Sequence, residues 1–538
     1  MTEEKWSRVV DLVGQRCLTY LLAADEHQGK TSLTFEELLP QQLAVLDALD
    51  SILPIGNEFD HEILKMSAVA TRLGCPAMAN GSSWAVTLRA MAGAYFATVT
   101  SADSLALHLL RLLRDCYALL LLPGGHPMMG AQLAASIFTN PSNREFEAAV
   151  LQDDDLNRLF PDVSEHSGHS GPYMSPGTGG TIQLWGLSEK LINAAWCLAR
   201  LDTEYPSEEA TAERLVGVLR DFRKIALGKT VKVPVRVGLT GVQLPDTSIV
   251  VDFTDSLLRS VDERDGWLTS HLGIGGKLSG ETPEGDSIQI DYAGDVVLET
   301  TMDFKIHRQS FKDEWPMDLR AMQMKLDEKV ELLRLALALA TAESPLLVVV
   351  SWQATFHPFE TSPKMSWREA HRNSKLVPRR LSVDQVDGWR THGHKVLSLP
   401  MKKVEIAVRR ALLALGERNM SEDILIDSVM VWENLFGSKL ETGLRVCGSM
   451  AWLLGTDVAS RKALRRELSD LYELRSQVVH GSSGLKPEEH AQAIRAMQLA
   501  LQALRAVAMD HPSLLQLSDG GSRSSHILLG GIANEEDA

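Results

Sequence analysis

The sequence predicts an α+β multidomain protein that is mainly α-helical. Apolar residues recur at helical spacing along most of the chain, whereas between Lys229 and Lys305 they alternate at every second position, as in strands. The chain has 538 residues, which is more than a single hydrophobic core normally organises. We therefore expect an N-terminal helical region, a central β-rich module and a C-terminal helical bundle.

Residues 1–227 are predicted to form a helical region that is interrupted by one mobile insert. The apolar spacing predicts helices over residues 6–24, 35–53, 62–73, 84–97, 102–122, 182–200 and 208–227. Near residues 152–180 the apolar pattern gives way to Asp, Ser, Gly and His, as in loops. His166 and His169 lie in this insert without a second pair of ligands, so no metal is expected there.

Residues 228–312 are predicted to form a β-rich module. Valine occupies every second position from Val231 to Val237, which is the pattern of a half-buried strand. Pro234 lacks a backbone N–H, which predicts that this first strand lies at an edge of its sheet. The glycine-rich residues 273–279 superficially resemble a phosphate-binding loop. The first glycine and the Ser or Thr after the lysine are missing, so we expect a hairpin turn and no cofactor.

Residues 313–399 are predicted to be a mixed α/β connector. A long helix is expected over residues 317–341, followed by a buried strand over residues 346–352. Between Lys364 and Arg380 the chain carries six Lys and Arg residues with few acids. Such a run is usually a solvated face, and contact with nucleic acid is the alternative.

Residues 400–512 are predicted to form a helical bundle, and residues 513–538 a disordered tail. We expect bundle helices over residues 403–415, 423–436, 442–454, 460–480 and 487–509. The tail prediction rests on a run of Gly and Ser followed by acidic residues at the end of the sequence.

The charge of the chain restricts the kinds of partner that it can bind. A formal net charge of -16 argues against a protein that coats nucleic acid nonspecifically, because such binding needs Lys and Arg to neutralise phosphates. Residues 402–480 are less acidic than the rest, with twelve Lys and Arg against eleven Asp and Glu. A local nucleic-acid site in this stretch is therefore compatible with the composition.

The cysteine pattern and the apolar runs predict a cytoplasmic protein with no membrane partner. The five cysteines are far apart, odd in number and set in apolar helical contexts, as expected of buried free thiols: Cys17, Cys75, Cys116, Cys197 and Cys447. The first residues contain no signal sequence, and the longest apolar runs are far shorter than a membrane span.

The residues with the clearest chemistry lie near the end of the helix predicted over residues 460–480. Arg475 is permanently charged, and the imidazole of His480 is a common proton-transfer group. Ser476 and Tyr472 precede His480 at intervals of four, so these side chains lie on one face of the helix. Gly481 fits the left-handed position just beyond a helix C-terminus.

Three stretches of the predicted bundle resemble the Apea-like branch of the HEPN domain superfamily, over about residues 400–510. They are Val-Trp-Glu-Asn-Leu-Phe-Gly at 431–437, Ala-Trp-Leu-Leu-Gly at 451–455 and Leu-Tyr-Glu-Leu-Arg-Ser-Gln-Val-Val-His-Gly at 471–481. The resemblance implies a helical bundle that pairs with a second copy and, in many members, a metal-independent endoribonuclease. It assigns Arg475 and His480 to the catalytic motif and Glu433 to an acidic position on an earlier helix. Many catalytic members have Asn, Asp or His directly after the arginine, where this chain has Ser476.

This assignment is chemically reasonable because RNA carries its own nucleophile, the 2′-hydroxyl. His480 can move a proton, and Arg475 can hold phosphate oxygens as negative charge accumulates. Ser476 can orient either residue, and Tyr472 can line the cleft or stack on a base. A two-fold dimer would place two Arg/His pairs in one cleft. Four cations lie earlier on the same helix and either steer the RNA backbone or form a solvated helix face: Arg461, Lys462, Arg465 and Arg466.

The sequence leaves a non-catalytic alternative open. Arg475 can instead pair with Glu433 inside the bundle and His480 can cap the helix, in which case the bundle serves only for dimerisation or partner binding. The leading hypothesis is a cytoplasmic, homodimeric ribonuclease that acts as a toxin in prokaryotic antiphage defence. Residues 1–400 would then restrain it until a signal such as a phage component arrives.

Overall fold

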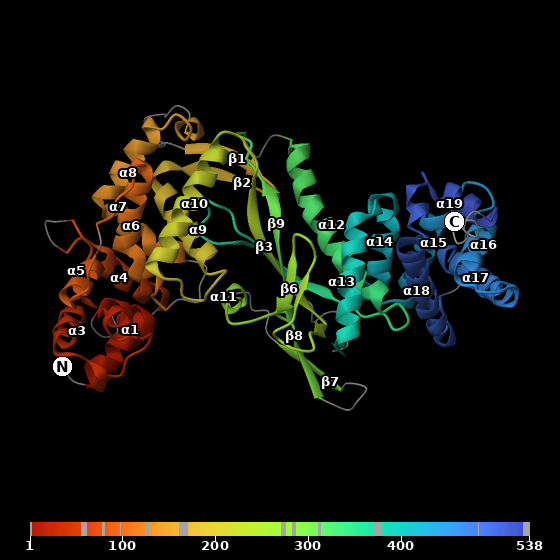
Figure 1. Ribbon diagram of the computed structural model, residues 1–538, viewed down its shortest axis with the longest axis horizontal. Coiled ribbons are helices and arrows are strands. Elements are labelled where there is room, and N and C mark those ends of the chain that lie inside the picture. The colour runs from red at the N-terminus through yellow and green to blue at the C-terminus, as the bar shows by residue number, and fades with distance from the viewer. Residues whose placement is uncertain are drawn as a thin grey trace.

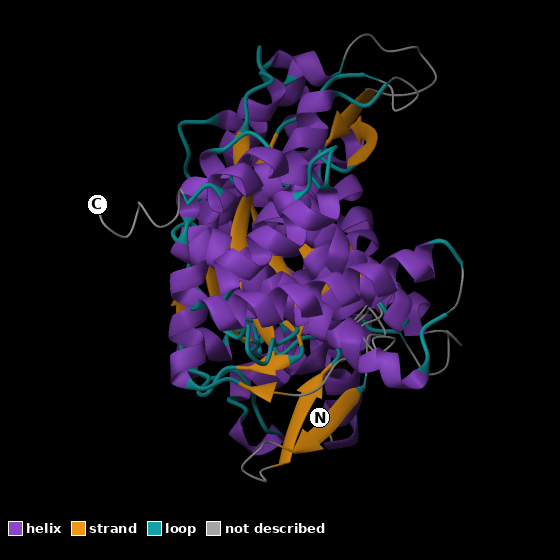
Figure 2. Ribbon diagram, turned by 90° about the vertical axis from the view of Figure 1, so that its right-hand side faces the viewer, coloured by secondary structure: helices purple, strands orange, loops and turns teal. Residues whose placement is uncertain are grey.

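The computed structural model describes residues 3–54, 62–77, 81–96, 98–123, 129–160, 170–270, 276–281, 287–309, 314–368, 379–481 and 484–530. N-terminal helices, a central sheet and a C-terminal helical bundle follow one another along the longest axis of the molecule (Figure 1). Helices hide most of the strands when the molecule is seen from its C-terminal side (Figure 2). The predicted α+β, mainly α fold class is confirmed.

The N-terminal region is built around α6 (Ser104–Leu120), which packs against most of the other helices of the region. Leu109, Leu113 and Tyr117 bury one face of α6, and Asp103 caps its first turn by accepting a hydrogen bond from the Leu105 N–H. The surrounding helices are α1 (Glu3–Leu21), α2 (Ala24–Gln28), α3 (Pro40–Ile52), α4 (Glu62–Gly74), α5 (Trp84–Met91), α7 (Met129–Thr139), α8 (Pro141–Gln152), α9 (Leu187–Ala199) and α10 (Glu208–Ala226).

Part of the predicted mobile insert is a β-hairpin, which corrects the expectation for residues 152–180. Strands β1 (Ser170–Ser175) and β2 (Thr178–Gln183) pair antiparallel, and the helix predicted from residue 182 begins only at Leu187. Tyr173 Oη donates a hydrogen bond of 2.6 Å to Glu360 Oε1, 187 residues away in sequence. Local sequence cannot reveal a partner so distant. His166 and His169 lie outside the described residues.

The central sheet has the strand order β11-β10-β3-β9-β6-β5, and its neighbouring strands are antiparallel. Its strands are β3 (Val231–Thr240), β5 (Val250–Asp252), β6 (Leu257–Ser260), β9 (Val296–Phe304), β10 (Val349–Thr355) and β11 (Lys364–Trp367). The sheet therefore crosses the predicted boundary at residue 312, because β10 and β11 come from the predicted connector. Smaller pairs are β4 (Val242–Gln243) with β12 (Arg379–Arg380) and β7 (Lys277–Glu281) with β8 (Ser287–Asp291).

Strand β3 lies inside the sheet, so the prediction of an edge strand was wrong. It pairs with β9 on one side and with β10 on the other. Pro234 is tolerated because the β10 ladder ends beside it: the last pair is Thr355 with Val235, and Phe356 N donates to Pro234 O. In a β-strand the backbone N and O of one residue point towards the same neighbouring strand. The side of Pro234 that lacks an N–H therefore faces β10, just beyond the last residue pair between β3 and β10.

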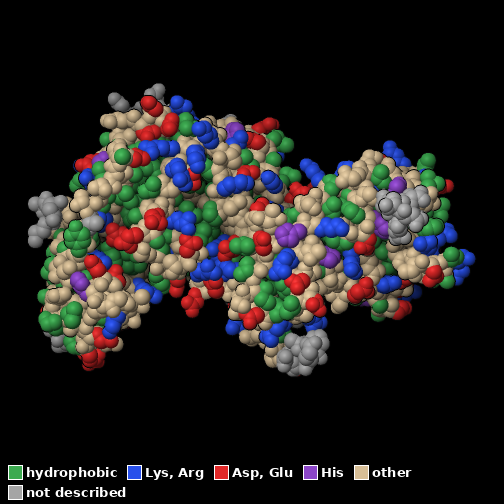
Figure 3. Space-filling view, in the orientation of Figure 1, with side chains coloured by type: hydrophobic (Ala, Val, Ile, Leu, Met, Phe, Trp, Pro, Cys, Tyr) green, Lys and Arg blue, Asp and Glu red, His purple; other side chains and the backbone are tan. Residues whose placement is uncertain are grey.

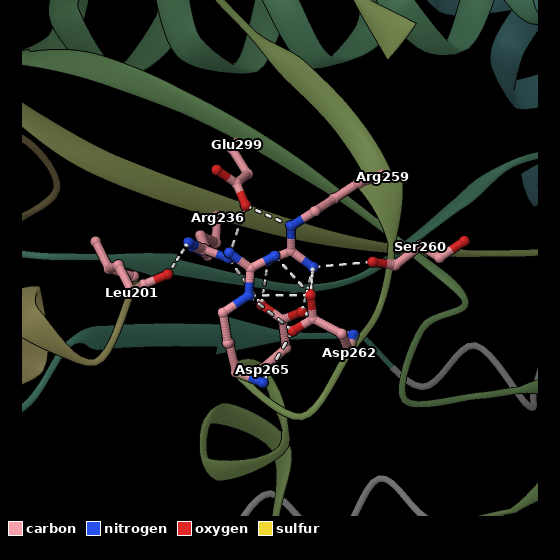
Figure 4. A network of polar contacts seen from close by, with 8 residues as sticks. Leu201, Arg236, Arg259, Ser260, Asp262, Asp265 and Glu299 are labelled. Carbon is pink, nitrogen blue, oxygen red and sulfur yellow. Dashed lines mark hydrogen bonds and ion pairs between the residues drawn. The ribbon is translucent and has the colours of Figure 1, made fainter. Parts of the chain in front are cut away.

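Helices flank the sheet, and a buried ionic network joins it to the N-terminal region. α10 contacts β3, while α12 (Met317–Ala340) packs on β9 and α13 (Val383–Ser398) packs on α12 (Figure 1). Arg236 and Arg259 face the carboxylates of Asp265 and Glu299, with Asp265 only 1% exposed (Figure 4). Arg236 Nη2 also donates to the Leu201 carbonyl just beyond α9, at 2.9 Å.

The C-terminal bundle surrounds α15 (Ser421–Phe436), whose Trp432 and Phe436 are completely buried. The other helices are α14 (Glu405–Leu412), α16 (Thr442–Leu454), α17 (Val458–Val479), α18 (His490–Arg505) and α19 (Gly520–Leu528). The predicted helix bounds agree with α15, α16 and α17 to within two residues because a glycine follows each helix and Asp457 caps the start of α17.

The predicted disordered tail is wrong for its first part. Residues 512–516 form a short 3-10 helix, and α19 packs against α15 and α16. Arg523 is 1% exposed and its Nε donates to the Leu435 carbonyl at 2.7 Å, which fixes α19 to the end of α15. Residues 531–538 lie outside the described residues.

Candidate nuclease site in the C-terminal bundle

Helix α17 presents one apolar face and one polar face, as its sequence predicts. Leu468, Leu471 and Leu474 are buried at the spacing of a helix packed on a core. The Asp457 side chain accepts a hydrogen bond from the Ser460 N–H and begins the helix. Gly481 follows its end with a φ of 68°, the left-handed conformation expected of that glycine.

Glu433 of α15 brings together two of the predicted site residues of α17. Tyr472 Oη donates a hydrogen bond of 2.6 Å to Glu433 Oε1, and Arg475 Nη2 lies 3.4 Å from Glu433 Oε2. Burial and the neighbouring Glu433 carboxylate raise the pKa of Tyr472 above its usual value. Tyr472 is therefore a hydrogen-bond donor at neutral pH, and Glu433 holds both side chains.

The Arg475 guanidinium group is only partly engaged. Its contact with Glu433 lies at the long end of the hydrogen-bond range. Its Nε is buried and has no hydrogen-bond partner among the described residues, while 21% of the side chain stays exposed. A guanidinium group has five N–H donors in a planar fork, so this arrangement leaves donors for an anion.

His480 stands apart from the Glu433 cluster. It is exposed at the C-cap of α17, where its backbone N–H donates to the Ser476 carbonyl at 3.0 Å. Within the described part of the chain, no hydrogen bond or ion pair joins its imidazole to Arg475, Tyr472 or Glu433. Five residues of helix rise about 7.5 Å and turn about 500°, so the Arg475 and His480 side chains leave the helix end in different directions.

Three of the four predicted RNA-steering cations line one groove. Arg461, Lys462 and Arg465 lie beside apolar residues of α16 and α19, whereas Arg466 is exposed outside the lining. The Arg461 guanidinium lies 3.9 Å from the centre of the Trp452 ring and its Nε donates to the Gly455 carbonyl. Lys and Arg side chains gather visibly at this end of the molecule (Figure 3).

Helix α19 contributes to this site, although the sequence predicted no helix there. Arg523 Nη2 donates to the carbonyl of Asn434, the residue next to Glu433, at 2.9 Å. Arg445 Nη1 donates to Ser525 Oγ at 2.8 Å and ties α16 to the same helix. The available signal was the cap, because Asp519 is followed three residues later by Ser522, whose N–H it accepts at 2.8 Å.

The structure describes only parts of the other segments that the sequence singled out. Arg368 lies 3.5 Å from Glu417, and residues 369–378 of the basic run lie outside the described residues, as do residues 271–275 of the glycine-rich segment. Of the predicted buried thiols, four are buried and Cys75 is half-buried. No described helix has the length and apolar character needed to cross a bilayer.

Comparison of the chain with family models, with curated proteins and with solved structures gave no match.

Proposed function

We propose that the C-terminal bundle is a metal-independent endoribonuclease of the HEPN type that acts as a homodimer. The observation that carries the proposal is the presence, at the end of one helix, of a partly engaged Arg475 and an exposed His480. The Leu-Arg-Ser-x-x-Val-His-Gly pattern around them supports it from the sequence side. The site needs only a proton-transfer group and a phosphate-binding cation, and these two residues provide both.

In the proposed reaction, the 2′-oxygen of RNA attacks the adjacent phosphorus. Its proton passes to one His480 as the new P–O bond forms. The bond to the 5′-oxygen breaks, and that oxygen takes a proton from the His480 of a second copy. Arg475 stabilises the charge that develops on the phosphate oxygens, and Glu433 keeps its side chain in place. Lys462, Arg465 and Arg466 would guide the RNA backbone.

The decisive variant is His480→Ala in the full chain. Wild-type protein should cleave RNA in the presence of EDTA, and His480→Ala should lower the rate by about a hundredfold or more, because that is the usual contribution of general acid–base catalysis. Cleavage of a panel that includes tRNA is followed by gel electrophoresis. His490→Ala is the matched control, since it removes another exposed histidine of the same bundle.

Thermal unfolding and sedimentation should be the same for wild type and both variants. Equal cleavage by wild type and His480→Ala, or no cleavage of any RNA by wild type, would rule the proposal out. We further propose a role as a toxin in prokaryotic antiphage defence, restrained by residues 1–400. Expression of wild type should then arrest growth and degrade RNA, whereas His480→Ala should not.

A non-catalytic, partner-binding bundle is the second candidate. It is favoured by the contact between Glu433 and Arg475, which neutralises the arginine within one chain. In that case His480 is only the residue that ends α17, and the His480→Ala experiment separates the two candidates.

A further inference from the structure

The outer face of α16 carries apolar side chains that the bundle core does not use. Val446 and Met450 are completely buried against the core. Leu444 and Trp452, eight residues apart and thus on one side of the helix, are 51% and 43% exposed. A helix with a second, outward apolar stripe has the pattern of a helix that packs against something further.

Helices α17 and α19 complete a groove over this stripe. Val458 at the start of α17 is 66% exposed, and Leu528 at the end of α19 is 36% exposed. Gly448 lets α19 approach, because a Cβ at this position would lie 3.2 Å from Leu528 Cδ2. The resulting α16–α17–α19 groove has a volume of about 450 Å³ and is lined by Leu444, Gly448, Ala451, Trp452, Val458, Arg461, Lys462, Arg465 and Leu528.

Positive charge is concentrated on one wall of this groove. Arg461, Lys462 and Arg465 fall within five residues of α17, and none of the described lining residues is acidic. Arg461 is held over Trp452 and to the Gly455 carbonyl, so it forms part of the wall. Lys462 and Arg465 are exposed and remain available to an incoming ligand.

The combination of an aliphatic floor and a basic wall favours a protein ligand over nucleic acid. Phosphates would use the cations but would leave Leu444, Val458 and Leu528 uncovered. Bases need open aromatic faces, and Arg461 already lies over the one aromatic ring in the described lining, Trp452. A second copy would bring the same cations against themselves in a two-fold contact.

We propose that the α16–α17–α19 groove binds an amphipathic helix of a partner protein. The apolar side of that helix would cover Leu444, Trp452 and Val458, and Asp or Glu on its flank would pair with Lys462 and Arg465. Grooves between packed helices bind amphipathic helices through apolar anchors at helical spacing. One consequence rests on the proposed function: the partner would cover the cations proposed to guide RNA, and would therefore lower RNA cleavage.

Binding is measured directly, so the test does not depend on nuclease activity. Two fluorescein-labelled amphipathic helical peptides have the same leucine face. The polar face of the first carries Glu, and that of the second carries Lys. Fluorescence anisotropy with the full-length protein should show saturable binding of the Glu peptide, weakening as salt rises. The Lys peptide should bind at least about tenfold more weakly, because its lysines would face the cations of the groove.

Paired variants locate the binding site on the molecule. The double variant Lys462→Glu/Arg465→Glu should lower the affinity for the Glu peptide by at least about tenfold, because two attractive contacts become repulsive. Arg466→Glu is the matched control: it makes the same charge change on the same helix outside the groove lining and should leave binding unchanged. Leu444→Glu should abolish binding, whereas Ile494→Glu on α18, a residue of similar exposure at 50%, should not.

Three outcomes would overturn the proposal. The first is no saturable binding of the Glu peptide, or equal binding to wild type and to the Lys462/Arg465 double variant. The second is saturable binding of a labelled uridine oligomer that is lost in the double variant and that the Glu peptide does not displace. This result would assign the groove to nucleic acid. The third is a dimer that Leu444→Glu dissociates, which would assign it to a second copy.

Discussion

At the residue scale, the two side chains proposed to act at the end of α17 have different environments. Arg475 is held by Glu433 and half-covered, while His480 is exposed at the helix end. Apolar spacing predicted a helix over residues 460–480 that contains both residues, and the family resemblance suggested Glu433 as a partner of Arg475. The hydrogen bond of Tyr472 to the same carboxylate could not be foreseen, because it depends on how α15 and α17 pack in three dimensions.

Glu189 provides a pH-dependent test at this scale. It lies in the first turn of α9 and is 8% exposed, and burial raises its pKa from 4.5 to about 7. Below pH 4.5 the carboxyl is protonated in both the folded and the unfolded chain. As the pH rises towards 7 the unfolded chain loses this proton first, so this residue makes the protein less stable with rising pH.

Glu189→Gln should remove this effect. The variant should unfold at a higher urea concentration than wild type at pH 7.5 and at a similar one at pH 4.5. A difference of about 3 kcal/mol in the free energy of unfolding is expected at the higher pH, because the pKa rises from 4.5 to about 7 and each pKa unit represents 1.36 kcal/mol. Glu209→Gln, an exposed acid, is the control. If wild type and Glu189→Gln differ in free energy of unfolding by the same amount at both pH values, burial does not set the pKa of Glu189.

At the element scale, α19 shows why a helix can be missed in a sequence. Its sequence, Gly-Gly-Ser-Arg-Ser-Ser-His-Ile-Leu, has low helix propensity and resembles a tail. The helix is fixed by Arg523, which reaches carbonyls of α15 that lie 88 and 89 residues earlier. By contrast, α15, α16 and α17 have apolar spacing and a glycine just beyond their last turn, so their bounds followed from the sequence.

Arg523→Ala tests the contribution of this contact. The variant leaves two α15 carbonyls without their charged donor, and hydrogen bonds to charged groups contribute about 1.5–3 kcal/mol each. We expect a loss of about 3 kcal/mol in the free energy of unfolding, measured by urea denaturation. Arg466→Ala, which removes an exposed arginine of the same bundle, should change stability by less than about 0.5 kcal/mol. A wild-type-like Arg523→Ala would show that α19 is not held by this side chain.

At the scale of the whole molecule, long-range contacts decide where the units begin and end. The sequence predicted the three kinds of region in their correct order, because periodicity is a local property. It placed a boundary at residue 312, which the sheet crosses, since the pairing of β3 with β10 joins segments more than a hundred residues apart. No local pattern specifies which strand pairs with which.

The ionic network beneath the sheet is the contact to test at this scale. Asp265 is the shared carboxylate between Arg236 and Arg259, and its removal would leave two buried guanidinium groups with too few acids. Asp265→Ala should therefore cost about 3–5 kcal/mol, as for other broken buried ion pairs. Asp262→Ala also loses a contact with Arg259, but this residue is 39% exposed and its loss should cost under about 1 kcal/mol. Equal urea midpoints for the two variants would show that the buried Asp265 contributes no more to stability than the exposed Asp262.

The pairing of β3 with β10 also sets an order of events during protein synthesis. After β9 ends at Phe304, the ribosome must add 44 residues before β10 begins at Val349, which takes roughly 2–9 s at ordinary elongation rates. Until then one side of β3 has no strand beside it. The C-terminal bundle is made later still. A nascent chain thus has its N-terminal helices and its sheet available before the proposed nuclease exists, so a restraint located there can be in place when the bundle folds.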